Sequence, residues 1–454
     1  MTHRHLAAFL SVLLPAAPLV RAQAPTITEE AVRTTVSWLA ADERAGRDTG
    51  SPELVATGEW IAERFAKAGL QKVADNSWYH EFPLPGHVLD SKAVKLTLVR
   101  QFGDEQKTFD LAADTDVRQW TVAEVLTGEG EACTVAQLED PVMQRLLFAK
   151  SARRPIVCEV PADHPYWLQS KGVRPVLGKA REASRPILLL RQGALPPAPP
   201  QDHREVTWTA TWSVGAPEKV DVPQRNVMAL RPGTTKKDEY VVVSAHYDHV
   251  GVGSPVDGDR IYNGADDDAT GTTAVILIAE ALAKMPPTAR SVLFVCFTGE
   301  ERGLLGSKAF CERPPVPLDK VVANVNLEML GRPEEGKAGQ AWITGHDLSD
   351  FAAIAGPALQ RRGVELVEFP MAGRLFAASD NWSFVQKGVV AHSISGGSLH
   401  KDYHQPGDQV DKLDLPHMTK VIGAVLEFTR ELADRDAAPQ WNDKGRERLQ
   451  RGKR

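Results

Sequence analysis

Hydrophobic residues follow two different periods along this chain of 454 residues. Near the start, Leu54, Gly58, Ile61 and Phe65 recur at the spacing of one helix face, and Gly69 follows as a stop. This segment is predicted to be an amphipathic helix that packs on a core.

Four short apolar runs follow Asn226, and each run is continuous rather than alternating. Such runs are typical of strands covered on both faces. Helical patterns separate them, including an alanine-rich one over 272–285 and a final one over 418–432. Strands that alternate with helices predict an α/β fold with a largely parallel central sheet. The four predicted strands are 240–245, 292–297, 321–327 and 388–394.

The period changes to two between these regions. Val94, Leu96 and Leu98 alternate with polar residues, as do the apolar positions of 206–214, which indicates half-buried strands. We therefore expect a mostly β insert over 88–218, within a domain made of residues 25–87 and 219–436.

The two ends of the chain have their own composition. Arg4 and His5 precede an apolar stretch over 6–20, and Ala22-Gln23-Ala24 has the small residues of a cleavage site. Residues 1–24 are therefore expected to be a signal peptide of a secreted or periplasmic protein. The rest of the chain has no apolar run long enough to span a membrane. The basic segment 437–454 is expected to be a disordered tail.

Charge and cysteine content limit the classes of binding partner and of stabilising bond that the chain is expected to have. A formal net charge of -6 and a pI near 6.1 give no reason to expect nucleic acid. Four cysteines are too few for a disulfide framework, and the sequence leaves open whether Cys133 and Cys158 pair. Oligomeric state is open as well.

Metal-binding residue types follow the predicted strands. In open α/β sheets, ligands bind beyond the carboxyl ends of the strands. Two adjacent glutamates directly after an apolar run, and three consecutive aspartates, are unfavourable unless positive charge offsets them. Histidines with carboxylates suit zinc. The residues concerned are His246 and Asp248, the segment 263–271, Glu300 and Glu301, Glu328, and Tyr403 and His404.

Five ordered motifs carry a family resemblance: HYDHVG, NGADDDATG, FTGEERGLLGS, NLEMLG and SDNWSF…DYHQPGD. Over residues 226–434 the chain resembles the co-catalytic zinc peptidases of clan MH, which include bacterial leucyl aminopeptidases and glutamate carboxypeptidases. The resemblance implies a three-layer α/β fold. The β insert resembles, more loosely, the protease-associated domain of some members.

The resemblance also implies two Zn²⁺ ions per chain. Asp266 would bridge both ions, with an unusual peptide bond to Asp267. The remaining ligands would be His246 and Glu328 on one ion, and Glu301 and His404 on the other. Many aminopeptidases of this kind have aspartate where this chain has Glu328, which leaves substrate preference open.

Three further residues receive roles from the resemblance. Glu300 would be the general base that takes a proton from the bridging water. Asp248 would lie behind His246 and fix its tautomer. Tyr403 would either stabilise the oxyanion or simply pack. His249, His392 and His400 are interpreted as ordinary polar residues.

The expected function is that of an exported metallopeptidase acting on peptides or small proteins, with aminopeptidase activity favoured over carboxypeptidase or dipeptidase activity. Two alternatives stay open: a glutaminyl cyclase-like enzyme with one zinc, and a non-catalytic receptor or scaffold on the same fold. Neither an HExxH nor a GxSxG motif occurs, so a zincin or a serine hydrolase is not supported.

Overall fold

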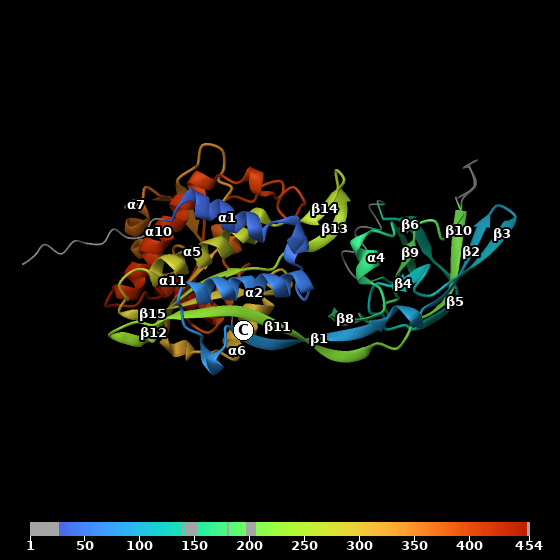
Figure 1. Cartoon of the computed structure of the whole chain (residues 1–454), viewed down its shortest axis with the longest axis horizontal. Coiled ribbons are helices and arrows are strands. Elements are labelled where there is room, and N and C mark those ends of the chain that lie inside the picture. Colours follow the sequence, from blue (N-terminus) through green and yellow to red (C-terminus); the bar gives the residue numbers. More distant parts are fainter. Residues whose placement is uncertain are drawn as a thin grey trace, which may run out of the picture.

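A nine-stranded sheet organises the larger part of the molecule (Figure 1). The computed structural model describes residues 27–138, 140, 143, 152–178, 181–196 and 206–451, so the expected signal peptide lies outside the described residues. The strand order is β18-β17-β19-β16-β12-β15-β11-β1-β8. Its centre is parallel, as predicted, and consists of β12 (Lys236–His246), β15 (Arg290–Phe297), β16 (Val321–Leu327) and β19 (Ala391–Ser395).

Further strands extend the sheet on both sides of this centre. β17 (Gln340–Ile343) pairs antiparallel with β19, and β18 (Glu365–Leu366) pairs parallel with β17. On the other side, β11 (Glu218–Arg231) pairs with β15 and with β1 (Tyr79–Asp90). The outermost strand is β8 (Val173–Leu177).

Helices cover both faces of the sheet. One face carries α1 (Glu29–Leu39), α2 (Pro52–Lys67), α5 (Gly271–Ala283) and α10 (Leu415–Asp434), and α7 (Phe351–Gln360) packs on α10. The other face carries α6 (Leu305–Glu312) and α9 (Asn381–Gln386), while the short α8 spans Ala372–Leu375. All eight residues of β15 are buried, because helices lie above and below it. Continuous apolar runs are what such a position requires.

β1 and β11 form a long antiparallel ladder that leads out of this body to a second, β-rich region (Figure 1). One of its sheets has the order β3-β2-β10-β5 and the other β4-β9-β7-β6. The first contains β2 (Lys95–Phe102), β3 (Glu105–Leu111), β5 (Thr127–Ala132) and β10 (Val206–Ser213). The second contains β4 (Val117–Gln119), β6 (Thr134–Gln137), β7 (Ile156–Val160) and β9 (Ile187–Arg191), with the short helix α4 (Pro165–Gln169) beside it.

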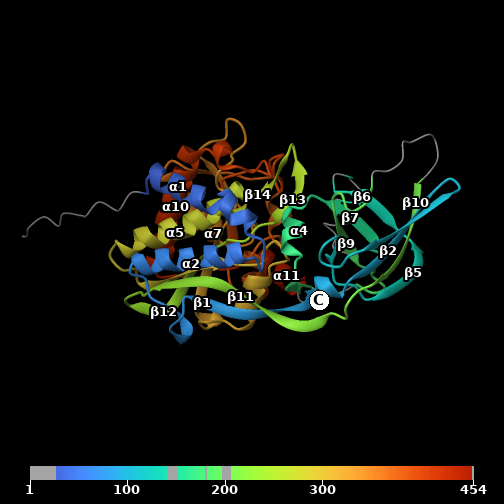
Figure 2. The same ribbon diagram turned by 45° about the vertical axis from the view of Figure 1, so that its right-hand side comes forward.

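The body also contains a hairpin of β13 (Gly251–Val256) and β14 (Asp259–Tyr262). Figures 1 and 2 both show α4 next to this hairpin. Within the insert, β6 and β7 are parallel and place Cys158 opposite Ala136 rather than Cys133.

The C-terminal segment differs from the expected disordered tail. Residues 443–451 form helix α11 (Asp443–Arg451), and Trp441 before it is only 9% exposed. The Trp441 indole donates a hydrogen bond to the Gly388 carbonyl at 3.0 Å. The apolar ring therefore anchors a segment whose basic composition alone predicts disorder.

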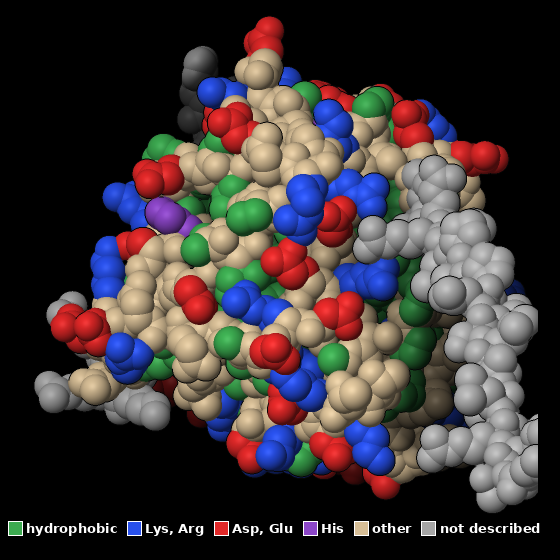
Figure 3. Space-filling model, turned by 90° about the vertical axis from the view of Figure 1, so that its left-hand side faces the viewer, with side chains coloured by type: hydrophobic (Ala, Val, Ile, Leu, Met, Phe, Trp, Pro, Cys, Tyr) green, Lys and Arg blue, Asp and Glu red, His purple; other side chains and the backbone are tan. Residues whose placement is uncertain are grey.

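The distribution of charged side chains on the surface is consistent with the modest net charge. The face of the body shown in Figure 3 carries acidic and basic side chains interspersed, without a patch of one sign among its described residues. Among the described residues, no helix combines the length and apolarity that crossing a bilayer requires.

Candidate metal centre

The parallel strands bring their carboxyl ends to one edge of the sheet. His246 is the last residue of β12, and β12 lies between β15 and β16. Glu300 and Glu301 follow β15, and Glu328 follows β16 directly. Because parallel strands end at the same edge, residues distant in sequence meet here.

A turn before α5 supplies the central carboxylate. Gly264 opens the turn at φ 56°, and the peptide bond between Asp267 and Asp268 is cis. The carboxylate of Asp408 accepts the backbone N–H groups of Asp266 at 3.0 and 3.1 Å and of Asp267 at 3.1 Å. These bonds hold the backbone of Asp266 and Asp267 in place.

Asp267 is the carboxylate that the two halves of the centre share. Its Oδ1 lies 3.2 Å from Nε2 of His246, and its Oδ2 lies 3.0 Å from Nε2 of His404. Burial opposes ionisation of Asp267, but contacts with both histidines hold the pKa of its carboxyl well below the ordinary value. One ionised side chain therefore faces both halves.

The first half contains His246 and Glu328. Nδ1 of His246 lies 3.1 Å from the backbone carbonyl of Asp248, and Nε2 lies 3.1 Å from Oε1 of Glu328. A neutral ring that donates from Nδ1 turns a lone pair on Nε2 toward two carboxylates, an arrangement that calls for a proton or a cation. Burial disfavours the imidazolium, yet Glu328 and Glu300 raise the pKa of His246 well above its usual value.

The second half contains Glu301, His404 and His249. Oε2 of Glu301 lies 3.1 Å from Nε2 of His404, and Oε1 lies 2.7 Å from Nδ1 of His249. Although burial and Asp267 act against it, the two histidines lower the pKa of Glu301 to about 2. His404 has φ 54°, a backbone conformation uncommon outside glycine and often found at functional sites.

Glu300 stands apart from these contacts. Oε2 of Glu300 is 4.0 Å from Nε2 of His246, and its backbone N–H donates to Oδ1 of Asp248 at 3.2 Å. Burial raises the pKa of the Glu300 carboxyl well above its ordinary value. Oδ2 of Asp248 accepts the Thr49 hydroxyl at 2.8 Å, so Asp248 connects the backbone of Glu300 with the His246 side.

The structure corrects the choice of central aspartate. Asp266, expected to bridge both ions, belongs to neither half. Its Oδ1 accepts the backbone N–H of Gly331 at 2.7 Å, and its Oδ2 lies 3.3 Å from Nε2 of His400. The two neighbouring carboxylates therefore have different partners: Asp267 faces His246 and His404, whereas Asp266 faces Gly331 and His400. The unusual peptide bond is likewise one residue later than expected.

The three histidines interpreted as ordinary polar residues have different environments. His392 is a core residue, with Nε2 2.7 Å from the Ser349 hydroxyl. His400 lies beside Asp266, and Arg332 donates to its Nδ1 at 3.1 Å. His249 is the residue that sequence reasoning missed. Its only signal was its place in HYDHVG, one position past Asp248.

Tyr403 lies on the outer side of the second half. Its ring stacks on that of His404, with centroids 3.9 Å apart and planes inclined by 19°, and the residue is 39% exposed. The stacking accounts for a packing role. Its expected part in stabilising an oxyanion stays a prediction.

The donor set fits zinc. Two groups of metal-ligating residues share Asp267, and within each group the ligand atoms lie within 4.8 Å of one another. Zinc takes imidazole nitrogens and carboxylate oxygens at about 2.0–2.2 Å in near-tetrahedral sites, which would place ligand atoms roughly 3.3 Å apart. The groups are His249, Asp267, Glu301 and His404, and His246, Asp267 and Glu328.

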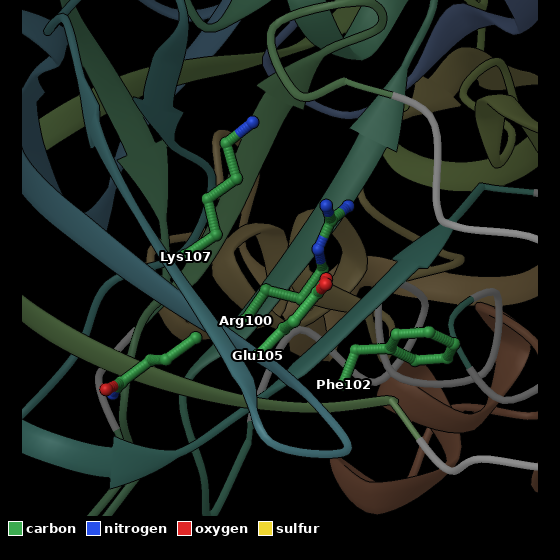
Figure 4. Close-up of a pocket in the computed structure, with 5 residues that line it drawn as sticks. Arg100, Phe102, Glu105 and Lys107 are labelled. Atoms are coloured by element: carbon green, nitrogen blue, oxygen red, sulfur yellow. The ribbon is translucent and has the colours of Figure 1, made fainter.

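A separate hollow of about 320 Å³ lies in the insert, on the β2–β3 hairpin (Figure 4). Its lining combines basic, acidic and aromatic side chains, but among those residues there is no histidine, cysteine or pair of carboxylates. It therefore offers none of the chemistry found at the strand ends. The lining residues are Arg100, Phe102, Glu105, Gln106 and Lys107.

Comparison with known sequences finds relatives of the body. The sequence pattern of peptidase family M28 matches residues 226–429. A probable leucine aminopeptidase of Arthroderma otae is 29% identical over 223 residues, which cover 46% of this chain and 57% of the relative. Aminopeptidase YwaD of Bacillus subtilis is 25% identical over 225 residues, with 48% of this chain and 46% of the relative covered. The chain thus spans about half the length of these relatives.

Solved structures share the fold over a greater length. A zinc aminopeptidase from Bacillus subtilis aligns with a TM-score of 0.58 and 16% identity, over 93% of this chain and 99% of that one. An aminopeptidase from Aneurinibacillus sp. strain AM-1 aligns with a TM-score of 0.51 and 20% identity, over 90% and 95%. At these identities the likeness shows the α/β architecture.

Proposed function

This chain belongs to peptidase family M28 through residues 226–429, and from this premise we propose that it is an aminopeptidase that works with two zinc ions. The observation that carries the proposal is the position of Asp267. Its two oxygens face ring nitrogens of different halves, at 3.2 and 3.0 Å. A carboxylate so placed can serve two cations at once.

Each half would hold one ion. His246 and Glu328 would complete the first, and Glu301 and His404 the second, with Asp267 common to both. Two such ions, when bound, lower the pKa of a shared water and stabilise the oxyanion that develops on the scissile carbonyl.

Glu300 is the residue left to move the proton. It lies outside both ligand groups, next to His246, and burial raises its pKa. A raised pKa brings a carboxylate nearer to the pH at which it can both accept and donate a proton. Its carboxylate would take a proton from the attacking water and deliver it to the amine of the departing residue.

Side chains around Glu300 hold it for this role. Its backbone N–H donates to Asp248, whose other oxygen accepts the Thr49 hydroxyl. The backbone carbonyl of Asp248 lies within hydrogen-bond distance of Nδ1 of His246. Asp248 therefore positions the general base and one metal ligand together, through its carboxylate and its carbonyl respectively.

The protein is proposed to act outside the cytoplasm, as a secreted or periplasmic enzyme. The support is the sequence of residues 1–24, with an apolar stretch and a small-residue cleavage site. Mass spectrometry of the mature protein from its producing cells should find Pro25 at the amino terminus. A mature chain that retains Met1 would refute export by this signal.

A panel of peptides tests the proposed activity. Peptides with free and with acetylated amino termini are incubated with the purified protein, with and without a chelator, and zinc is counted per chain. Hydrolysis of the free peptides alone, lost with the chelator, and two zinc ions per chain are expected.

The other outcomes identify the alternatives. One zinc per chain with cyclisation of amino-terminal glutamine would indicate the glutaminyl cyclase-like function. Zinc binding without hydrolysis of any peptide would indicate a receptor or scaffold. Hydrolysis of blocked peptides would contradict the aminopeptidase assignment and leave the metallopeptidase intact.

A further inference from the structure

His249 occupies a buried position in the second half of the centre. The residue is 0% exposed, and within the described chain neither of its ring nitrogens makes a hydrogen bond of acceptable geometry. A buried imidazole without a partner is costly. Nδ1 nevertheless points at carboxylates, 2.7 Å from Oε1 of Glu301 and 3.9 Å from Oδ2 of Asp267.

The turn before α5 makes room for this ring. Gly264 has φ 56°, and a Cβ atom at this position would lie 2.5 Å from Cγ and Cδ2 of His249. Any side chain there would collide with the imidazole. The absence of a side chain at 264 therefore lets the His249 ring approach the cluster.

Buried hydrogen bonds fix the backbone on both sides of the ring. The Arg47 guanidinium donates to the carbonyls of Tyr247 and Gly264 at 3.0 Å and of Asn263 at 2.7 Å. The backbone N–H of His249 donates to the Arg47 carbonyl at 3.0 Å. The position of the His249 ring is thus fixed by two backbone segments, at Tyr247 and at 263–264, that the buried Arg47 side chain links.

We propose that His249 is an additional ligand of the ion on the Glu301 side. The distances support this role, because ligand atoms around a tetrahedral zinc are roughly 3.3 Å apart. Those between the two histidines and the two carboxylates of this half run from 2.7 to 3.9 Å. The rings of His249 and His404 are inclined by 74°, with centroids 5.5 Å apart, and both face the carboxylate of Glu301.

The two ions would then be unequal, an inference that rests on the proposed two-zinc function. Four side chains would hold the ion on the Glu301 side, whereas three would hold the ion on the Glu328 side. Zinc sites closed by four protein ligands are typically structural, and sites with three keep a position for water or substrate. The ion on the Glu301 side is therefore expected to bind first and leave last.

Metal retention tests this inference without reference to activity. Zinc-loaded wild type, His249→Ala and His249→Gln are titrated with a chelator, and bound zinc is measured by elemental analysis. Glutamine keeps an amide that can donate a hydrogen bond to Glu301 but is a poor zinc ligand. His346→Gln, a change at a partly exposed histidine, is the control, and circular dichroism of the metal-free proteins monitors folding.

Two steps of zinc release are expected for the wild type and the control. Both His249 variants should weaken the tighter step by at least about tenfold, since even an outer-shell partner contributes about that much. X-ray absorption should detect three imidazoles shared by two zinc ions in the wild type and two imidazoles in His249→Gln.

The same measurements separate failure of the His249 assignment from failure of the two-zinc proposal. Wild-type affinity restored by glutamine, or an unchanged imidazole count, would show that His249 only positions Glu301, and the inference would be wrong while the two-zinc proposal stands. A wild type that binds no zinc would overturn both.

Discussion

The body and the insert both contain parallel strands, yet only one of them gathers metal-ligating chemistry among its described residues. In the body, His246 at the end of β12, Glu301 after β15 and Glu328 after β16 meet around Asp267. In the insert, β6, β7 and β9 are also parallel neighbours, but β7 ends at Val160 and is followed by a turn in which His164 caps helix α4. Parallel strand ends alone therefore do not make a metal site; the residues that follow the strands determine whether one forms.

Replacement of the Asp267 carboxylate by an amide should have the largest effect on zinc content and turnover. Asp267→Asn removes the charge that faces both halves, so loss of zinc from both sides and a fall in turnover of about 10³-fold or more are expected. In Asp266→Asn the amide oxygen can still accept the Gly331 N–H, and a change below about tenfold is expected, the scale of one hydrogen bond. Elemental analysis and peptide hydrolysis measure both variants. The reverse ranking would restore Asp266 as the shared carboxylate.

The general base gives the next largest effect. Glu300→Gln should lower turnover by about 10²-fold or more while both zinc ions stay bound, because Glu300 belongs to neither ligand group. The matched control is Glu159→Gln in the insert, where burial also raises the pKa of a glutamate on a parallel strand. That variant should keep normal turnover. Near-normal turnover in Glu300→Gln would remove the base assignment.

The central strands could be predicted from the sequence because a strand that is buried on both faces is a continuous run of apolar residues. The runs at 292–297 and 321–327 are continuous and apolar, and they form β15 and β16. His246, Glu301, Glu328 and His404 are brought together as expected, because their positions after the strands follow from the topology.

Finer features depend on backbone geometry that residue patterns do not encode. Asp266, Asp267 and Asp268 are all buried, so polarity could not distinguish them, and only the turn directs Asp267 to the histidines. The position of the His249 ring depends on the missing side chain at Gly264, and the contact between these two segments cannot be read from either segment alone. The C-terminal helix was missed because Trp441, a single anchor, outweighs the basic composition around it.

Acidification should affect the insert through His164. Burial and Arg260 lower the pKa of this histidine to about 4, while Asp163 opposes the change. The unfolded chain takes up a proton below about pH 6.5 and the folded chain only near pH 4, so stability falls as the pH drops through this window. At pH 5 the loss is about 2 kcal/mol.

His164→Asn isolates this effect. Asparagine can still cap α4 by accepting the Tyr166 N–H, but it does not titrate. Denaturant unfolding at pH 7 and pH 5 should therefore show a smaller loss for the variant than for the wild type. Equal losses in both proteins would show that His164 is not the group that senses pH.

The smallest expected effects compare the two cores directly. Ile187 in β9 of the insert and Ile278 in α5 of the body are both 0% exposed. Replacement of either by valine removes one buried methylene and should lower the free energy of unfolding by about 0.5–1.5 kcal/mol. Zinc content and turnover should stay at wild-type values for Ile187→Val, because its neighbours contribute no ligand to the centre. A weakened zinc site in that variant would show that packing of the insert affects the strand ends of the body, on the side where α4 lies next to the β13–β14 hairpin.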